Sequence, residues 1–154
     1  MTERVRVGVG VIVLDGNQNV LLGKRLTKYN NGVWAVPAGH VERGETFIGA
    51  AERELFEETG LKAKKLELVG LNNYGDDKGE RQYVNIDFVV DKYEGILENK
   101  EPDLCSGWQW FRLDGLPDPL SPPTEIAIRA LMTGIICVTD NKHMGVGFRL
   151  KQLT

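Results

Sequence analysis

The segment Gly39–Leu61 reads GHVERGETFIGAAERELFEETGL, and it decides how the chain folds. Its first part, Gly39–Glu45, is predicted to be a loop punctuated by glycines. Thr46–Thr59 then predicts a helix, because its apolar residues recur at helical spacing. Gly60 follows as the residue that ends the helix, since glycine accepts the left-handed conformation without steric cost. The apolar residues expected to face the core are Ile48, Ala51 and Leu55.

Three acidic residues, Glu54, Glu57 and Glu58, share one side of the predicted helix. At about 100° per residue they span an arc of roughly 100°. Glu54 and Glu58 are like charges one turn apart, which costs an isolated helix about 0.2–0.5 kcal/mol. Acids in the last turn also oppose the helix dipole. Such runs are common on solvated helix faces, but the loop beside this one favours a compensating divalent cation with oxygen ligands.

The loop before the helix carries features that would hold it in place. Glu45 directly precedes the N-terminus of the predicted helix, where the helix dipole favours an acid. Arg53 is eight residues further on and can form a forked pair with its carboxylate. Gly39 and Gly44 provide the backbone freedom to fold the loop over the helix. A loop held in this way can direct main-chain carbonyls at a metal ion.

The rest of the chain predicts strands around this unit and a second helix. The turn Asp15–Gln18 should join the first two strands as a hairpin. The second helix should start at Ser121–Thr124, where prolines fit the first turn, run to about Met132 and end at Gly134. The predicted strands are Arg4–Leu14, Asn19–Arg25, Val33–Pro37, Leu66–Leu71, Gln82–Val90 and Gly107–Arg112.

This order of strands and helices predicts a single α/β domain with a mixed sheet and two main helices. Polar loops are predicted at Asn72–Glu80 and Glu94–Asp103. The tail Ile135–Thr154 is ambiguous, and either Val138 or Phe148 is expected to lie in a short edge strand.

Composition limits the classes of partner. The chain has 154 residues with 19 basic and 22 acidic side chains, a net charge of −3. That balance argues against a protein that coats nucleic acid or binds membranes through a basic patch. No apolar run approaches the roughly 20 residues of a membrane span, so a cytoplasmic location is the default expectation. A small phosphorylated substrate stays open, because a bound metal reverses the local charge.

The spacing of these residues resembles the Nudix hydrolase family. Its signature, the Nudix box, is G-x5-E-x7-R-E-U-x-E-E-x-G-U, where U is a bulky aliphatic residue, and Gly39–Leu61 reproduces it without departure. The flanking segments LLGKR (Leu21–Arg25), WAVPAGHVERGE (Trp34–Glu45) and WQWF (Trp108–Phe111) extend the likeness. Residues 1–154 are therefore expected to form one Nudix domain. The resemblance implies an α/β/α sandwich that cleaves a nucleoside diphosphate linked to another group.

The resemblance also implies roles for individual residues. Glu54, Glu57 and Glu58 resemble the carboxylate ligands of Mg²⁺, or of Mn²⁺ in its place, and the carbonyl of Ala38 resembles a further ligand. Glu45 and Arg53 resemble the pair that braces the loop, with Gly39 and Gly60 in supporting positions.

Other residues are candidates for the chemistry and for binding. The general base is Glu54 or a loop acid among Glu98, Glu101 and Asp103, with Glu101 favoured. Arg25 matches a position that contacts substrate phosphate, and arginine suits a bidentate phosphate contact. The aromatic residues that could stack on a base, although side chains of this kind are more often part of the core, are Trp34, Tyr83 and Trp108.

Within the family the chain looks most similar to the MutT-type and MTH2-like nucleoside triphosphate pyrophosphohydrolases, which implies a nucleotide substrate and favours a homodimer. The alternatives with the same chemistry are ADP-ribose, a nucleotide sugar or a dinucleoside polyphosphate. Hydrolases of ADP-ribose in this family typically carry a proline after the box. The corresponding segment here, Asn73–Asp77, has none, so ADP-ribose is a less favoured substrate. A non-catalytic nucleotide-binding module is the remaining alternative, although such modules usually lack part of the box.

Overall fold

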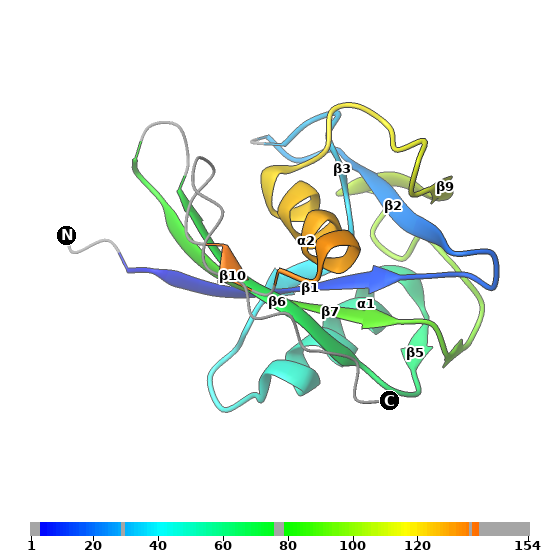
Figure 1. The fold of residues 1–154 in the computed structure, drawn as a ribbon, viewed down its shortest axis with the longest axis horizontal. Helices are drawn as coiled ribbons and strands as arrows, with labels where there is room; N and C mark the ends of the chain where they lie inside the picture. Colours follow the sequence, from blue (N-terminus) through cyan, green and yellow to red (C-terminus); the bar gives the residue numbers. More distant parts are fainter. Residues whose placement is uncertain (1–3, 29, 76–78, 136, 139–154) are drawn as a thin grey trace.

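The computed structural model describes residues 4–28, 30–75, 79–135 and 137–138. A five-stranded mixed sheet forms its centre, and two helices cover opposite faces of that sheet (Figure 1). The helices are α1 (Phe47–Thr59) and α2 (Pro122–Thr133). In sheet order the strands are β10 (Cys137–Val138), β6 (Glu67–Gly75), β7 (Gln82–Val90), β1 (Arg6–Val13) and β4 (Ala38–His40). The predicted α/β/α sandwich with a mixed sheet is confirmed.

Two smaller sheets complete the described part of the chain. In the first, β2 (Asn19–Arg25) pairs with β3 (Trp34–Ala35) and with β9 (Cys105–Arg112), antiparallel in both cases. In the second, β5 (Lys62–Ala63) pairs with β8 (Tyr93–Glu94). No described helix is long and apolar enough to cross a membrane.

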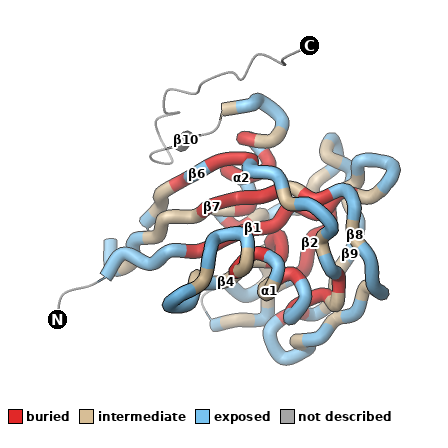
Figure 2. Tube along the Cα trace, turned by 90° about the horizontal axis from the view of Figure 1, so that it is seen from below, coloured by how far each residue is buried: buried red, intermediate tan, exposed pale blue. Residues whose placement is uncertain are grey.

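The central sheet is buried on both faces because its strands alternate between two apolar cores. Val9, Val11 and Val13 of β1 pack with α1, whereas Ile12 and Leu14 pack with α2. Figure 2 shows the buried residues concentrated in β1, β7 and the helix faces against them. Each core is therefore sealed by one helix, and the edge of the sheet at β4 lies beside α1.

Helix α1 has the ends that its sequence predicts. The Thr46 side chain accepts a hydrogen bond from the Gly49 N–H at 3.0 Å, and Gly60 follows the helix with φ of 75°. The predicted apolar stripe is wrong at one position. Ala51 and Leu55 are fully buried, but Ile48 is 49% exposed, because the first turn extends beyond the apolar contact of the helix. The buried residues of the helix are Ala50, Ala51, Leu55, Glu58 and Thr59.

The predicted hairpin between the first two strands is also wrong. β1 pairs with β7 along its whole length on one side and with β4 at Gly8–Gly10 on the other, and β2 pairs with β3 and β9 instead. Only an isolated bridge between Leu14 and Val20 joins the two segments. The Asp15 carboxylate instead caps the turn by accepting hydrogen bonds from the Asn17 and Asn19 N–H groups, and the chain then enters the second sheet.

Several predicted boundaries shift. β2 and β7 have the predicted bounds, and α2 matches with Ser121 as its N-cap and Gly134 as its C-cap. β6 runs on to Gly75, and Gly39 and His40, predicted as loop, belong to β4 because they pair with β1. In the tail, Val138 lies in β10 against β6, whereas Phe148 falls outside the described residues.

A pair of substitutions in α1 tests this packing. Leu55→Ala should lower the free energy of unfolding by about 2–5 kcal/mol, because it leaves a cavity under the sheet. Ile48→Ala, in the exposed first turn, should change it by no more than about 0.5 kcal/mol. Urea denaturation of both variants measures the difference, and equal losses would contradict the assignment of Ile48 to the surface.

Candidate functional site

Arg53 links the loop to the helix through several hydrogen bonds. Its guanidinium donates to both carboxylate oxygens of Glu45, at 2.6 and 3.0 Å, and to the His40 carbonyl at 3.0 Å. Glu45 also accepts a bond from the Glu42 N–H at 2.8 Å. The Arg53 hydrogen bonds lower the pKa of Glu45 to about 2, so this carboxylate stays ionised. The loop between β4 and α1 is thereby fastened to the middle of the helix.

Gly39 leaves the space in which the Glu54 side chain lies. A Cβ atom at position 39 would overlap the Glu54 carboxylate, so a residue without a side chain is required there. Arg53 Nη1 donates to Glu54 Oε1 at 2.8 Å. Burial raises the pKa of Glu54 and the Arg53 contacts oppose that rise. Glu54 is therefore a largely buried carboxylate held between the backbone of β4 and a single guanidinium.

Glu58 is the most buried of the three acids, and one of its oxygens has no hydrogen-bond partner. Its side chain is 5% exposed, and Oε2 lies 3.8 Å from Arg25 Nη1. Oε1 accepts a long bond from the Ala38 N–H at 3.4 Å. Burial raises the pKa of Glu58 to about 8, and the Arg25 charge lowers it only in part. A buried carboxylate in this situation is stabilised by a cation.

The donor set fits a hard divalent ion. In the antiparallel pair of β1 with β4 the bonds shown are Val11 N–H to the Pro37 carbonyl and Val41 N–H to the Val7 carbonyl. Ala38 lies at the alternate, non-bonded position, so its carbonyl points away from β1 on the side where its N–H meets Glu58. Carbonyl and carboxylate oxygens are the ligands that Mg²⁺ and Mn²⁺ prefer.

Among the described residues, no three acidic, histidine or cysteine side chains lie close enough together to hold a metal ion as they stand. The reason lies in Arg53, whose Nη1 contacts Glu57 at 3.2 Å as well as Glu54. Glu57 is half-exposed, so its side chain has room to turn toward the other two. The three carboxylates suit a divalent metal ion chemically. They can surround such an ion once the Glu57 side chain turns away from Arg53.

The loop after β8 brings one further acid to the site. The Lys100 N–H and Trp108 Nε1 both donate to the Glu58 carbonyl, at 3.2 Å each. These bonds satisfy the C-terminal end of α1 and hold the loop against it. Glu101 is consequently close enough for its charge to raise the pKa of both Glu54 and Glu58. The other two candidates from this loop, Glu98 and Asp103, are exposed.

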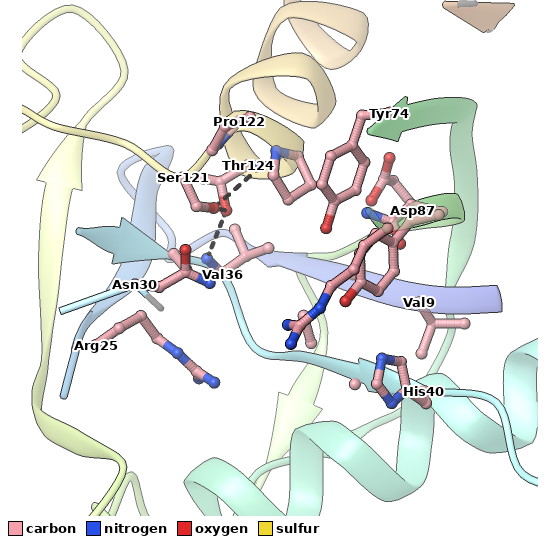
Figure 3. A pocket seen from close by; sticks show the side chains of 18 of the residues that line it. Val9, Arg25, Asn30, Val36, His40, Tyr74, Asp87, Ser121, Pro122 and Thr124 are labelled. Atoms are coloured by element: carbon pink, nitrogen blue, oxygen red, sulfur yellow. Dashed lines mark hydrogen bonds between the residues drawn. The ribbon is translucent and has the colours of Figure 1, made fainter. Parts of the chain in front are cut away.

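A cavity of about 550 Å³ opens beside these acids, on the sheet face that α2 only partly covers. Figure 3 shows Arg25 at one end and Asp87 and Tyr74 at the other, with the start of α2 as one wall. Ser121 Oγ donates a hydrogen bond to Thr124 Oγ1, and Thr124 Oγ1 also accepts one from the Val36 N–H at 3.1 Å. These bonds hold the start of α2 against the connection between β3 and β4. The volume is within the range of small-molecule sites.

The floor of the cavity is made by glycines and polar side chains. Cβ atoms at Gly8 and Gly10 would lie 2.6 and 2.7 Å from the side-chain oxygens of Asn85 and Asp87, respectively. Asn72 Nδ2 donates to Asp87 Oδ2 at 2.7 Å. Burial raises the pKa of Asp87 to about 7, and the bond from Asn72 limits the rise. Gly10, Asn85 and Asp87 line the cavity, and Asn72 of the neighbouring strand holds the Asp87 carboxyl.

Sequence analysis did not identify this floor. Polar residues alternate in Gln82–Val90 at Tyr83, Asn85 and Asp87, and glycines alternate in β1, which is the signal that could have found it. Of the aromatic candidates, Tyr83 lines the cavity and stacks on Tyr74 at 5.0 Å between ring centroids. Trp34 packs against Phe111 in the core under α2, and Trp108 packs against the core under α1.

Comparison with known proteins places the chain among relatives with this arrangement. The NUDIX domain profile matches residues 4–131. An RNA pyrophosphohydrolase from Pelagibacter ubique is 33% identical over 129 residues, which cover 74% of this chain and 80% of that protein. The NAD-capped RNA hydrolase NudC from Haemophilus influenzae is 31% identical over 86% of this chain, but the chain spans only 49% of its length.

A solved structure shows the same fold. The MutT NUDIX hydrolase from Burkholderia pseudomallei is 30% identical and superposes with a TM-score of 0.80, covering 84% of this chain and 99% of that one. Two of these relatives carry RNA in their names, so the expectation of no nucleic-acid partner stays a prediction.

Substitution of Gly39 tests the position of Glu54. Gly39→Ala should lower metal-dependent hydrolysis by about 10–100-fold, the usual cost of disturbing the groups that position metal ligands, because the new Cβ displaces the carboxylate. Gly16→Ala is the matched control, since nothing lies within 4 Å of a Cβ there. Steady-state hydrolysis at several metal concentrations measures the effect. Unchanged metal dependence in Gly39→Ala would contradict the packing described.

Asp87 predicts a pH dependence of stability. Its pKa rises from 3.8 to about 7 on folding, so the folded protein holds a proton that the unfolded chain has released. The contribution of Asp87 to stability therefore falls as the pH rises through that interval. Asp87→Asn should gain stability relative to wild type as the pH rises from 3.8 to about 7, measured by urea denaturation. A stability difference that does not vary with pH would count against the buried state of this carboxyl.

Proposed function

The chain belongs to the NUDIX family and is a hydrolase of pyrophosphate bonds, and on that premise we propose that it cleaves a nucleoside triphosphate to the nucleoside monophosphate and pyrophosphate. The observation that carries this proposal is the continuity of the carboxylates with the cavity. Arg25 lines the cavity and also lies 3.8 Å from Glu58. A nucleotide in the cavity would thus place its phosphates at the acids of α1.

In this proposal Glu54, Glu57, Glu58 and the Ala38 carbonyl hold Mg²⁺, or Mn²⁺ in its place. The bound ion supplies a water of lowered pKa and neutralises charge on the bridging oxygens. Glu45 and Arg53 do not touch substrate in this assignment; they hold the loop that carries Ala38 and Gly39. Gly60 ends the helix in the left-handed conformation, so that the chain turns back beside Glu58.

The residues around the reacting phosphorus have separate tasks. Arg25 binds a phosphate oxygen through its guanidinium and orients the chain of phosphates. The water oxygen forms a bond to phosphorus while the bond to the bridging oxygen breaks, and pyrophosphate leaves. Glu101, or Glu54, accepts the proton that the water loses. The position of Glu101 near both acids supports its candidacy over Glu98 and Asp103, which are exposed.

The 5′ end of an RNA is the second candidate substrate. The 33% identity to an RNA pyrophosphohydrolase over most of both chains favours it. The chemistry is the same, because a 5′-triphosphate carries the same anhydride bonds. The similarity to a MutT NUDIX hydrolase and the net charge of −3 favour the free nucleotide instead. Proposals of a dimer and of a single domain through residue 154 rest on the family resemblance alone.

Hydrolysis assays separate these substrates. Purified protein should release pyrophosphate from nucleoside triphosphates with Mg²⁺ and release none after chelation. An RNA oligonucleotide with a 5′-triphosphate, cleaved faster than any free nucleotide, would transfer the assignment to RNA. Absence of metal-dependent release from either substrate, and from ADP-ribose, nucleotide sugars and dinucleoside polyphosphates, would leave a nucleotide-binding module and defeat the proposal.

Substitution of Glu57 tests the metal assignment. Glu57→Gln should lower kcat by about 10²-fold or more while leaving the fold intact, because this half-exposed side chain packs against nothing in the core. Glu52→Gln, exposed on the same helix, is the control and should retain activity. Steady-state kinetics and thermal unfolding measure both. A loss of thermal stability that parallels the loss of activity would argue for a structural role.

A further inference from the structure

Asp87, Gly10 and Ala38 form one row across three strands. Gly10 of β1 is the register partner of Asp87 in β7 and of Ala38 in β4. Neighbouring strands lie about 4.8 Å apart, so Asp87 and Ala38 are separated by about 10 Å. That span is comparable with a nucleoside measured from its 5′ phosphate to the far edge of its base. The row leads from the acids of α1 to the polar floor of the cavity.

The Asp87 carboxyl lacks a charged partner in the described structure. It is 3% exposed, and the hydrogen bond from Asn72 is at one oxygen, Oδ2. The other oxygen, Oδ1, lies over Gly10, in the space that a side chain at this position would fill. A buried carboxyl with an unused acceptor next to a cavity is suited to a ligand that donates a hydrogen bond.

The surroundings favour a flat ligand with an amide-like edge. Asn85 lies beside Asp87 over Gly8, and its side chain hydrogen-bonds Tyr74. The rings of Tyr74 and Tyr83 and the pyrrolidine of Pro122 line the same cavity. Polar edge groups with ring-shaped walls suit a nucleobase better than a metal ion, which would find a single carboxylate among amides.

We propose that Asp87 determines substrate specificity by accepting a hydrogen bond from the exocyclic amino group of a nucleobase that lies in this cavity. The inference rests on the proposed function, since it takes a nucleotide as the occupant of the cavity. Carboxylates accept from base amino groups in nucleic-acid recognition. Asn72 acts as a positioning residue, because its amide fixes the orientation of the carboxyl.

Equilibrium binding of monophosphates tests this directly. Titration calorimetry without metal compares amino-bearing AMP, GMP and CMP with amino-free IMP and UMP. IMP is the amino-free match of AMP and of GMP, and UMP is the amino-free match of CMP. The preferred ligand should carry an amino group and bind about tenfold or more tightly than its match, the discrimination typical of a base contact. Asp87→Asn should reduce that ratio to about one, whereas Asp91→Asn, at the exposed residue that follows β7, should preserve it.

Three results would overturn the inference. The first is equal binding of matched ligands by the wild type, which needs no variant and so does not depend on the stability of Asp87→Asn. The second is a ratio that survives in Asp87→Asn. The third is loss in that variant of discrimination between ribose and deoxyribose monophosphates, which would assign Asp87 to the sugar.

Hydrolysis by the wild type separates this inference from the proposed function. Release of pyrophosphate from nucleoside triphosphates without discrimination between matched bases would defeat the inference alone. Discrimination in binding without hydrolysis of any nucleoside triphosphate would defeat the proposed reaction and leave the role of Asp87 standing.

Discussion

The forked contact between Arg53 and Glu45 is the interaction on which the site depends. It joins a residue in the middle of α1 to the loop that precedes the helix, and the same guanidinium reaches the His40 carbonyl and the Glu54 carboxylate. Without it the loop would have little to hold it over the helix, because Glu42 and Gly44 are exposed. The backbone of β4 and the acids of α1 are therefore placed relative to one another by one side chain.

The central sheet gives the site its second component. Alternation along β1 sends its valines toward α1 and leaves Gly8, Gly10 and Ile12 facing the side of α2. Helix α2 covers only the part of that face that carries Ile12. The remaining part is open, and its floor is polar because β7 places Asn85 and Asp87 over the glycines. The metal-binding candidates and the cavity thus meet along one edge of the sheet.

Burial of acidic groups is the electrostatic feature that both components share. Burial raises the pKa of Glu58 to about 8 and of Asp87 to about 7. The fold would be more stable if either carboxyl were exposed or replaced by an apolar group. The stability of the fold therefore does not explain why these two acids are buried. Glu58 is next to Arg25 and the Ala38 backbone, and Asp87 is next to two amides. The surroundings of Glu58 therefore suit a bound cation, and those of Asp87 suit a neutral hydrogen-bond donor.

The sequence by itself determined the helix α1, its caps at Thr46 and Gly60, the Arg53–Glu45 pair and the grouping of Glu54 with Glu58, because all of these follow from spacing within one segment. It also determined most strand positions, since period-two patterns are local. Only the tertiary structure decided that β1 pairs with β7 and not with β2, that Ile48 is exposed, that Glu101 lies by the acids, and that Asn85 and Asp87 share a cavity, with Asn72 bonded to Asp87. These facts depend on contacts between residues far apart in the chain, and local patterns carry no information about which strands become neighbours.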